Sequence, residues 1–251
     1  MLLAVDIGNT TICLAILKGQ RVVQKWYVDT VRDRRILEGK LREVMKPIKG
    51  RSPEAAVICS VVPRALQVVK PILQRGLKIK ATVVGEDIKV PITHRYRDPR
   101  QVGQDRLVCA YAAKVFYGLP VIVIDLGTAI TLDVVSKKAE YLGGIIVPGI
   151  RLSAESLFKK TAMLPKIKIK GPQAIIGRNT EESILSGLFF GYGALCRGLI
   201  ELIAQQIKGK PRVVVTGGYA LLMRKYISGN IRAVDKDLVL KGIGLVWKQR
   251  K

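Results

Sequence analysis

The sequence predicts an α/β protein made of two similar domains, residues 1–115 and 116–251. An apolar segment that ends in an acid and a glycine turn, Val5-Asp6-Ile7-Gly8-Asn9, has a counterpart in Ile124-Asp125-Leu126-Gly127-Thr128. After each of these segments the pattern continues with further strands and then with alternating helices and strands. A hairpin repeated at equivalent places in two α/β patterns indicates two similar lobes around a cleft.

In the first domain the order of elements is strand-strand-strand-helix-strand-helix-strand, as in a ribonuclease-H-like domain. Glycine turns separate the opening strands, and apolar residues at three-to-four spacing from Ile36 to Ile48 predict the first helix. A second helix begins at Pro63, and Gly76 is expected just past its end. The strands are expected over Leu2–Asp6, Ile12–Leu17, Arg21–Val28, Ala55–Val62 and Lys78–Val84.

The same order then restarts after a helix near Arg100–Tyr117. A buried strand, Pro120–Asp125, again ends in an acid, and two more strands follow it. A long helical pattern covers Glu181–Ile207. The domain is expected to finish with a strand over Arg212–Thr216 and helices that flank Ile231–Val234.

Length and composition exclude several classes of protein. A chain of 251 residues that is 49% hydrophobic can bury a core and is not disordered. The longest apolar runs, such as Val121–Ile124 and Leu199–Ala204, are too short to cross a bilayer. The apolar start, Met1–Asp6, lacks a basic region and is typical of a first strand, not of a signal peptide. We therefore expect no membrane partner.

Cysteine and histidine usage indicates neither a disulfide framework nor a zinc site. The four cysteines lie far apart in the sequence, and the chain has a single histidine, His94. Buried free thiols of this kind are typical of a reducing compartment, so we expect a cytoplasmic protein. His94, with no acid or cysteine beside it in the sequence, is expected to be structural. The cysteines are Cys13, Cys59, Cys109 and Cys196.

The formal net charge of +24 raises the question of nucleic-acid binding. Residues 1–115 contain 22 Lys and Arg against 10 Asp and Glu, and the remaining residues contain 21 against 9, so each half carries +12. The charge is therefore spread over the chain, and Lys166–Lys170 alternates with apolar residues as a half-exposed strand would. We expect a solvated basic surface that favours small anionic substrates, with no specific nucleic-acid partner.

The repeated hairpins are suited to phosphate binding. An acid that follows a buried strand is held rigidly and can carry Mg²⁺ through water, as we expect for Asp6. Gly8 has no β-carbon, so backbone N–H groups of the turn can approach phosphate oxygens. A single hairpin of this kind would be an ordinary acidic turn, but a pair could hold the two ends of a triphosphate. Hydroxyl and amide side chains that add donors are Asn9, Thr10, Thr11 and Thr128.

A third element runs from a buried strand, Val213–Thr216, through Gly217 and Gly218 into a helix. Such an opening lets a nucleotide lie against the backbone. The sequence contains no GxxxxGK[ST] segment, which excludes a P-loop kinase, and no GxGxxG loop after the first strand. An ATP site in this chain would therefore be of the two-lobed kind.

Together these segments resemble the phosphate and adenosine motifs of the superfamily of actin, heat-shock chaperone ATPases and sugar kinases. More narrowly, the chain resembles the type III pantothenate kinases from residue 5 to about residue 220. The segments that carry this narrower resemblance are Tyr96–Pro99, Gly103–Arg106, Gly143–Gly149, Thr161–Pro165 and Gly177–Thr180. The resemblance implies two ribonuclease-H-like, actin-like ATPase domains with an ATP cleft between them, and ATP-dependent phosphorylation of pantothenate, the first step of coenzyme A biosynthesis.

The resemblance also implies a role for each matching residue. Asp105 matches the general base for the primary hydroxyl of pantothenate, and Asp125 matches the site of a required monovalent cation, K⁺ or NH₄⁺. The residues expected to bind pantothenate are Tyr96, Gly103, Gln104, Arg106 and Thr180. Those expected to bind ATP are Asp6, Ile7, Gly8, Asn9, Thr10, Thr11, Ile12 and Cys13, together with Thr128, Gly217 and Gly218.

A homodimer is also implied, in which the partner subunit helps to complete the pantothenate pocket. The apolar pattern after Thr180 is consistent with an interface, although such helices also fill ordinary cores. Its apolar residues are Ile184, Leu185, Leu188, Phe189, Tyr192 and Leu195.

Two residues depart from the family pattern, and two other functions stay open. Gln104 stands where the family usually has Ala, and Asp98 where it usually has Asn, which bears on substrate affinity more than on reaction type. Asp105 lies where a helix N-terminus would stabilise its anion, but it could equally cap the helix or pair with Arg106. The alternatives are another small-molecule kinase of the superfamily, for example for sugars, and a catalytically silent regulatory homologue that binds nucleic acid.

Overall fold

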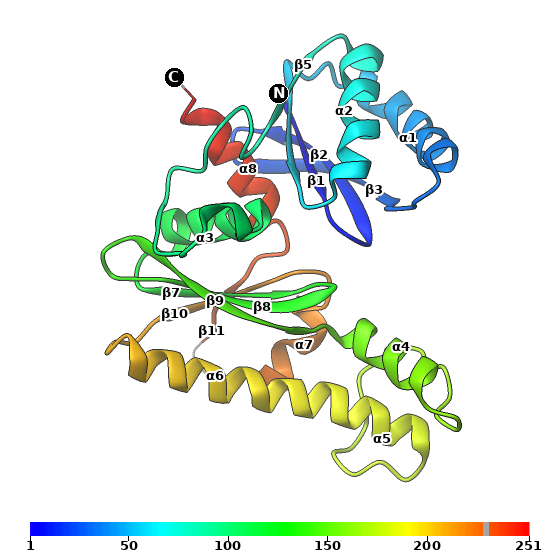
Figure 1. Ribbon diagram of the computed structural model, residues 1–251, viewed down its shortest axis with the longest axis vertical. Coiled ribbons are helices and arrows are strands. Elements are labelled where there is room, and N and C mark those ends of the chain that lie inside the picture. The colour runs from blue at the N-terminus through cyan, green and yellow to red at the C-terminus, as the bar shows by residue number, and fades with distance from the viewer. Residues whose placement is uncertain (228–230, 251) are drawn as a thin grey trace. The chain divides into compact units, whose positions relative to one another are not determined.

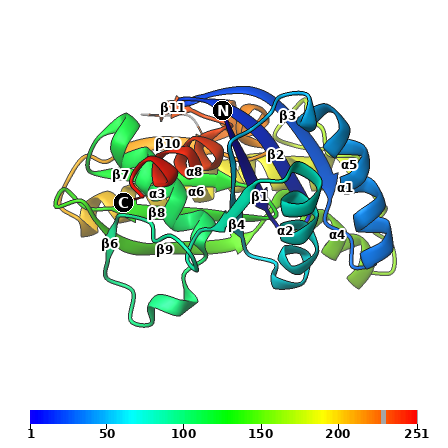
Figure 2. The same cartoon turned by 90° about the horizontal axis from the view of Figure 1, so that it is seen from above.

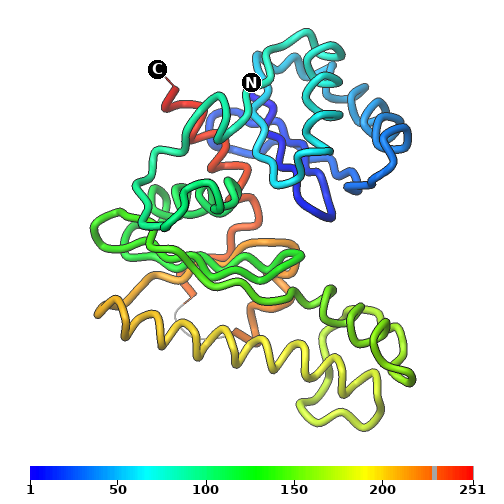
Figure 3. Tube along the Cα trace, in the orientation of Figure 1, coloured from blue at the N-terminus to red at the C-terminus, as the bar shows by residue number. Residues whose placement is uncertain are grey.

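The computed structural model describes residues 1–227 and 231–250. These residues form two compact units (Figures 1 and 3). Unit 1 contains residues 1–115 together with the C-terminal segment from Asp237 onward, and unit 2 contains Phe116–Lys236.

Unit 1 is built on a sheet with the strand order β3-β2-β1-β4-β5. Strands β1, β2 and β3 pair antiparallel, whereas β4 and β5 continue the sheet parallel to β1. The strands are β1 (Leu2–Ile7), β2 (Thr11–Lys18), β3 (Arg21–Asp29), β4 (Ala55–Ser60) and β5 (Lys80–Val83).

Helices cover both faces of this sheet. Helices α1 (Arg34–Lys49) and α2 (Pro63–Leu77) bury apolar residues in one core cluster with alternate residues of β1 and β2. Helix α8 (Leu238–Lys248) packs on β1, and it lies close to helix α3 (Gln104–Tyr117), since Gly242 leaves no room for a Cβ beside Val108. Between β5 and α3 the chain forms a short strand β6 (Thr93–His94), which is labelled in Figure 2, and then a 3₁₀ turn η1 (Pro99–Gln101).

Unit 2 repeats this arrangement. Its strands lie in the order β9-β8-β7-β10-β11, again with three antiparallel strands followed by two parallel ones. The sheets of the two units thus have the same connectivity, which confirms the predicted α/β duplication. The strands are β7 (Val121–Leu126), β8 (Ala129–Val135), β9 (Glu140–Pro148), β10 (Arg212–Thr216) and β11 (Ile231–Val234).

The helices of unit 2 follow β9 and β10. Helix α4 (Ile150–Lys160) comes first, and after an irregular segment the chain runs through α5 (Thr180–Ser186), a π-helical turn η2 (Gly187–Gly191) and α6 (Tyr192–Gln206). Helix α7 (Ala220–Ile227) follows β10. Leu185, Phe189, Cys196 and Ile203 bury one side of the long helical run in the core of this unit.

Three details differ from the sequence predictions. Residues from Asp237 onward, expected in the second domain, belong to unit 1, because apolar helix α8 packs on its sheet. The Lys166–Lys170 segment, which was expected to be a half-exposed strand, is not a strand. Its isoleucines alternate with lysines because Ile167 and Ile169 pack against the core of unit 2. Gly76 lies inside α2, where a Cβ would come within 2.5 Å of Met45 Cε, and Lys78 takes the left-handed C-cap conformation (φ 55°).

The run from Thr180 to Gln206 is the one helix among residues 1–227 and 231–250 that is long and apolar enough to cross a membrane. The run has 27 residues, and the mean hydropathy over an 18-residue window of it is 1.4, values that core helices of soluble proteins also reach. The separate apolar runs in the sequence did not predict it, because Gly187, Gly191 and Gly193 interrupt them without ending the helix. The expected absence of a membrane partner stays a prediction.

Candidate active site

Asp6 lies at the end of the central strand of unit 1, between two thiols. In the pairing register, Asp6 is directly opposite Cys13 of β2 and directly opposite Cys59 of β4. Because side chains of directly paired residues point to the same face of a sheet, the three side chains form a row. This face is opposite to the one that α1 and α2 cover, since Val5 and Ile7 are in the α1–α2 core.

The hairpin after Asp6 is closed by a residue that the sequence did not single out. The Gly8 N–H donates to the carbonyl of Thr11 (3.0 Å) inside the turn. Thr30, just after β3, donates its backbone N–H to the Thr10 carbonyl (2.9 Å) and its hydroxyl to the Gly8 carbonyl (2.7 Å). Thr30 therefore holds the turn from the end of β3. In the sequence it appears only as a hydroxyl residue after the third strand, which does not by itself indicate this role.

Asp105 lies in the first turn of α3, and its carboxylate folds back over Gly103. Its Oδ1 accepts the backbone N–H of Arg106 (2.8 Å). A Cβ on Gly103 would lie 2.5 Å from that same oxygen. Glycine at position 103 thus leaves the space that the carboxylate occupies, so Gly103 positions Asp105 in addition to any contact with a substrate.

The charges of Asp6 and Asp105 both act on the buried Cys59 thiol. Burial, followed by the negative charges of Asp6 and Asp105, holds the pKa of the Cys59 thiol well above its usual value. Cys13 lies on the other side of Asp6, and burial together with the Asp6 charge raises its pKa to about 12. Both thiols therefore stay protonated at neutral pH and add no charge beside Asp6.

In unit 2, Asp125 is surrounded by close-packed backbone. Asp125 pairs with Thr131 of β8 and with Thr216 of β10. The turn after β7 closes when Gly127 N–H donates to the Ala129 carbonyl (3.1 Å). Gly217 (φ 93°) lies so close that a Cβ would overlap Asp125 Oδ1 and reach within 2.6 Å of the Leu126 nitrogen.

Two further glycines near Asp125 differ in their surroundings: Gly149 is packed against the turn, whereas Gly218 faces open space. Gly149 N–H donates to the Thr128 carbonyl (3.1 Å), so the end of the Gly143–Gly149 segment packs on the turn. A Cβ on Gly218, by contrast, would meet nothing within 4 Å. The structure thus gathers Asp125, Thr128 and Gly217 within unit 2, beside open space at Gly218.

The other predicted site residues divide into exposed and buried groups. Asn9 and Thr10 are exposed, whereas Ile7 and Ile12 are fully buried, so these two can offer a ligand only their backbone. Arg106 is buried, and Tyr96 is half-buried in the segment between β6 and η1.

Both departures from the family pattern have a local structural role. The Gln104 side chain lies against Gly85 (φ 92°), where a Cβ would come within 2.6 Å of its Cδ. Asp98 caps η1 by accepting the Arg100 N–H (3.0 Å) and pairs with the Arg100 guanidinium (3.1 Å), which lowers the pKa of Asp98. Gln104 at the start of α3 thus packs against Gly85, and Asp98 caps the turn that precedes α3.

Thr180 begins helix α5 in unit 2, beside a hollow of about 550 Å³. Asn179 caps the helix by accepting the Glu182 N–H (2.9 Å), and Glu182 in turn accepts the Arg178 N–H (2.8 Å). This reciprocal capping fixes the helix start. Pro172–Arg178 and Glu182 line the hollow.

The oxygen atoms at Asp6 and Asp125 are suited to bind hard cations that retain some of their water ligands. Carboxylates, hydroxyls and carbonyls are the ligands that Mg²⁺ and K⁺ prefer. Asp125 is paired with the hydroxyl residues Thr131 and Thr216. The strand partners of Asp6, by contrast, are two cysteines, so Asp6 offers a cation its own carboxylate. Across the described residues, no group of three or more His, Cys, Asp and Glu side chains could cage a metal.

Comparisons with known proteins agree on the family. The family model of type III pantothenate kinase matches residues 2–202. A type III pantothenate kinase of Brevibacillus brevis is 37% identical over 257 residues, covering 100% of both chains. One from Dehalococcoides mccartyi is 38% identical over 256 residues, covering 100% of this chain and 96% of the relative.

Solved structures support the fold. A protein described as a Baf family transcriptional activator from Campylobacter jejuni aligns with a TM-score of 0.61 at 18% identity, covering 98% of each chain. A polyphosphate/ATP-glucomannokinase from Arthrobacter aligns with a TM-score of 0.53 at 15% identity, covering 99% of each chain. At such identities these likenesses concern the actin-like ATPase fold alone. The family match and the full-length relatives show more: the chain belongs to the type III pantothenate kinase family.

Proposed function

We propose that the protein transfers the γ-phosphoryl group of ATP to the primary hydroxyl of pantothenate, giving 4′-phosphopantothenate for coenzyme A synthesis. Besides family membership, the observation that supports this proposal is that Asp6 is paired with the buried Cys59 and that the charges of both Asp6 and Asp105 act on the Cys59 thiol within unit 1. The hairpin acid and the candidate base are thus within electrostatic range of one residue, which is consistent with the roles proposed for them.

In this proposal Asp105 accepts the proton of the pantothenate hydroxyl while the hydroxyl oxygen attacks the γ-phosphorus and ADP leaves. The backbone N–H of Arg106 holds one carboxylate oxygen in place. The hairpin of unit 1, Asp6–Cys13, and the unit 2 residues Thr128, Gly217 and Gly218 bind ATP. Positioning and electrostatics supply most of the catalysis in phosphoryl transfer.

Substrate and cation roles complete the proposal. Tyr96, Gly103, Gln104, Arg106 and Thr180 bind pantothenate, and the Arg106 guanidinium holds a polar or anionic group of it. Asp6 carries Mg²⁺ through water, and Asp125 carries K⁺ or NH₄⁺. When bound, these cations neutralise negative charge on the phosphate oxygens.

A coupled assay of ADP release tests the function. We expect turnover with ATP, Mg²⁺ and K⁺ only when pantothenate is added, with no turnover on glucose or N-acetylglucosamine. Turnover on a sugar without turnover on pantothenate would support another kinase of the superfamily. ATP binding without turnover on any of these substrates would favour the silent homologue.

The monovalent cation gives a second expected result. Replacing K⁺ by Na⁺ at constant ionic strength should strongly reduce the rate, because K⁺ and Na⁺ differ in size and in hydration. Asp125→Asn should remove the difference between the two salts by lowering the rate in K⁺. Equal wild-type rates in K⁺ and Na⁺ would contradict a monovalent site.

Gly103→Ala should lower kcat by disturbing Asp105. The added Cβ would stand 2.5 Å from Asp105 Oδ1, and a displacement of about 1 Å can cost about 10²-fold in rate. Gly39→Ala is the matched control, because a Cβ there meets nothing within 4 Å. If Gly103 acts through Asp105, adding Gly103→Ala to the Asp105→Asn variant should lower kcat little further. If the double variant instead loses as much additional kcat as Gly103→Ala costs in the wild type, Gly103 does not act by positioning Asp105.

We also propose a homodimer in the cytoplasm. Leu185, Leu188 and Phe189 of the expected interface fill the core of unit 2 instead. Other apolar side chains, in the segment between α4 and α5, support an interface by their exposure, namely Met163 (90%), Ile175 (65%) and Ile176 (78%). Four free cysteines are consistent with a reducing compartment. A fully active monomer in sedimentation at micromolar concentration would contradict the dimer.

A further inference from the structure

A hollow of about 410 Å³ lies between the second halves of α1 and α2 in unit 1. This volume is within the range of small-molecule sites. Four cationic side chains line it, with an apolar residue from each helix and a glycine. The lining residues are Arg42, Met45, Lys46 and Lys49 of α1, and Ile72, Arg75 and Gly76 of α2; we call this the α1–α2 groove.

The cations of the groove exceed the negative charge around them. Together α1 and α2 carry nine Lys and Arg and only two acids, Glu38 and Glu43. Arg34, Lys40 and Lys70 form ion pairs with Glu38, Asp29 and Asp87. No ion pair is formed by Arg42, Lys46 or Lys49 within residues 1–227 and 231–250.

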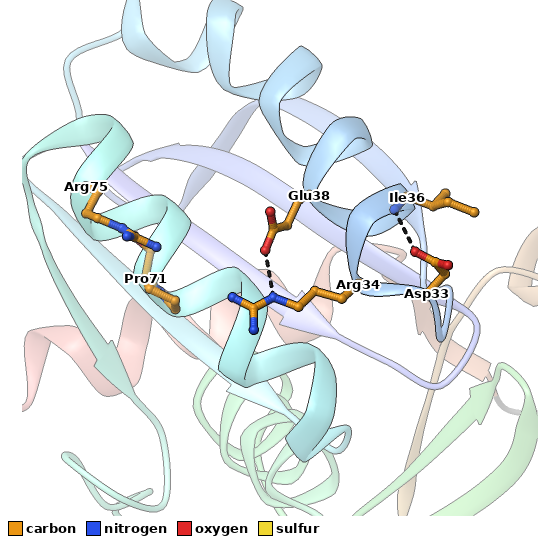
Figure 4. Close-up of polar contacts among 6 residues, drawn as sticks. All are labelled: Asp33, Arg34, Ile36, Glu38, Pro71 and Arg75. Atoms are coloured by element: carbon orange, nitrogen blue, oxygen red, sulfur yellow. Dashed lines mark hydrogen bonds and ion pairs between the residues drawn. The ribbon is translucent and has the colours of Figure 1, made fainter.

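Glu38 and the ends of the helices offset part of this charge. The hydrogen bond from Arg34, followed by the charges of Arg34, Arg42 and Arg75, lowers the pKa of Glu38, so it stays ionised near the groove. Figure 4 shows the Arg34–Glu38 pair on α1 beside α2, which carries Arg75. Each helix C-terminus contributes about half a negative charge. Four cations against one carboxylate and two helix ends leave a net positive charge of about two.

The floor of the groove is apolar. Met45 is buried, and its Cε lies where a Cβ of residue 76 would be only 2.5 Å away, so Gly76 makes room for the thioether. Ile72, one helical turn before Gly76, is partly buried beside the same core. A ligand in the groove would meet carbon atoms below and cationic groups at the rim.

The groove is separate from the candidate active site. Helix α2 begins beside the hairpin end of the sheet, where the Val61 N–H donates to the Ile7 carbonyl (3.1 Å). Ile72 and Arg75 follow Pro63 by nine and twelve residues. At about 1.5 Å per residue, they lie roughly 14–18 Å farther along the helix. An occupant of the groove would therefore leave Asp6 and Asp105 accessible.

We propose that the α1–α2 groove is a second binding site of this protein, for a small phosphorylated molecule that also carries an apolar group. The excess positive charge selects a phosphate, and the Met45–Ile72 floor selects an apolar group attached to it. A basic surface without a hollow would hold phosphate alone, whereas this site distinguishes phosphates of equal charge by their apolar part.

Hexyl phosphate and methyl phosphate, measured by calorimetric titration at low ionic strength, test this proposal. They carry the same charge, so we expect the wild-type protein to bind hexyl phosphate at least tenfold more tightly. Arg42→Glu/Lys46→Glu should weaken hexyl phosphate at least tenfold and leave the KM for ATP within twofold of the wild type. Lys18→Glu/Arg21→Glu is the matched control, because it changes the net charge equally at an exposed turn away from the groove.

Three results would overturn the proposal. Equal affinities for the two phosphates in the wild-type protein would mean that the apolar floor is not used. An equal loss in the control variant would mean that net charge alone attracts the ligand. Binding of an RNA oligonucleotide or of anionic vesicles that depends on Arg42 and Lys46, without binding of hexyl phosphate, would assign the groove to a macromolecular surface.

Discussion

Asp105→Asn is expected to lower kcat for pantothenate by about 10²–10⁴-fold, because the amide cannot accept a proton. The local structure should survive, since the Asn side-chain oxygen can still accept the Arg106 N–H that Asp105 Oδ1 accepts now. The KM for ATP should change little, because Asp105 lies on α3 and not in either hairpin. Steady-state kinetics with each substrate varied in turn would measure this.

Asp98→Asn is the matched control for that experiment. Asp98 is an acid of the preceding segment that caps η1 and pairs with Arg100, whose side chain is 90% exposed. Asn can keep the cap, and loss of a solvent-exposed ion pair has little effect on stability. Activity should therefore stay near the wild-type value. Full kcat in Asp105→Asn would show that the base lies elsewhere and that Asp105 only caps α3.

The hairpins and the order of the strands could be predicted because their signals are local. Gly8 and Gly127 mark turns directly after buried strands, and these turns are where the structure has them. The repeated pattern then led to two sheets of the same connectivity. Each of these signals lies within about ten residues, a range over which turn chemistry and hydrophobic period decide the local structure.

What could not be predicted depends on contacts between distant parts of the chain. Cys59 lies beside Asp6, where the charges of Asp6 and Asp105 both act on it, only because β4 pairs with β1 in one particular register. Thr30 closes the first hairpin from the end of β3, and helix α8 belongs to unit 1 because it packs on β1, with Gly242 fitting beside Val108. In each case the residue looks ordinary in the sequence, and tertiary packing gives it a role.

Asp6→Asn is expected to abolish turnover while a single cooperative thermal transition remains. The substitution keeps the size of the side chain in the row between Cys13 and Cys59, but it removes the negative charge that would hold Mg²⁺ through water. Glu54→Gln is the control, because Glu54 is an exposed acid that pairs with the N-terminal amine. The control should keep full activity at saturating Mg²⁺ and K⁺.

A thiol measurement makes this prediction independent of activity. Burial, followed by the Asp6 charge, raises the pKa of Cys13 to about 12, so removal of that charge should lower the pKa while burial keeps it above the usual value. A lower pKa gives more thiolate at a fixed pH, so alkylation of Cys13 at about pH 8.5 should be faster in Asp6→Asn than in the wild type. Near-normal turnover in a folded Asp6→Asn protein would contradict the phosphate role. An unchanged alkylation rate would instead contradict the close approach of Asp6 to Cys13, whatever the effect on turnover.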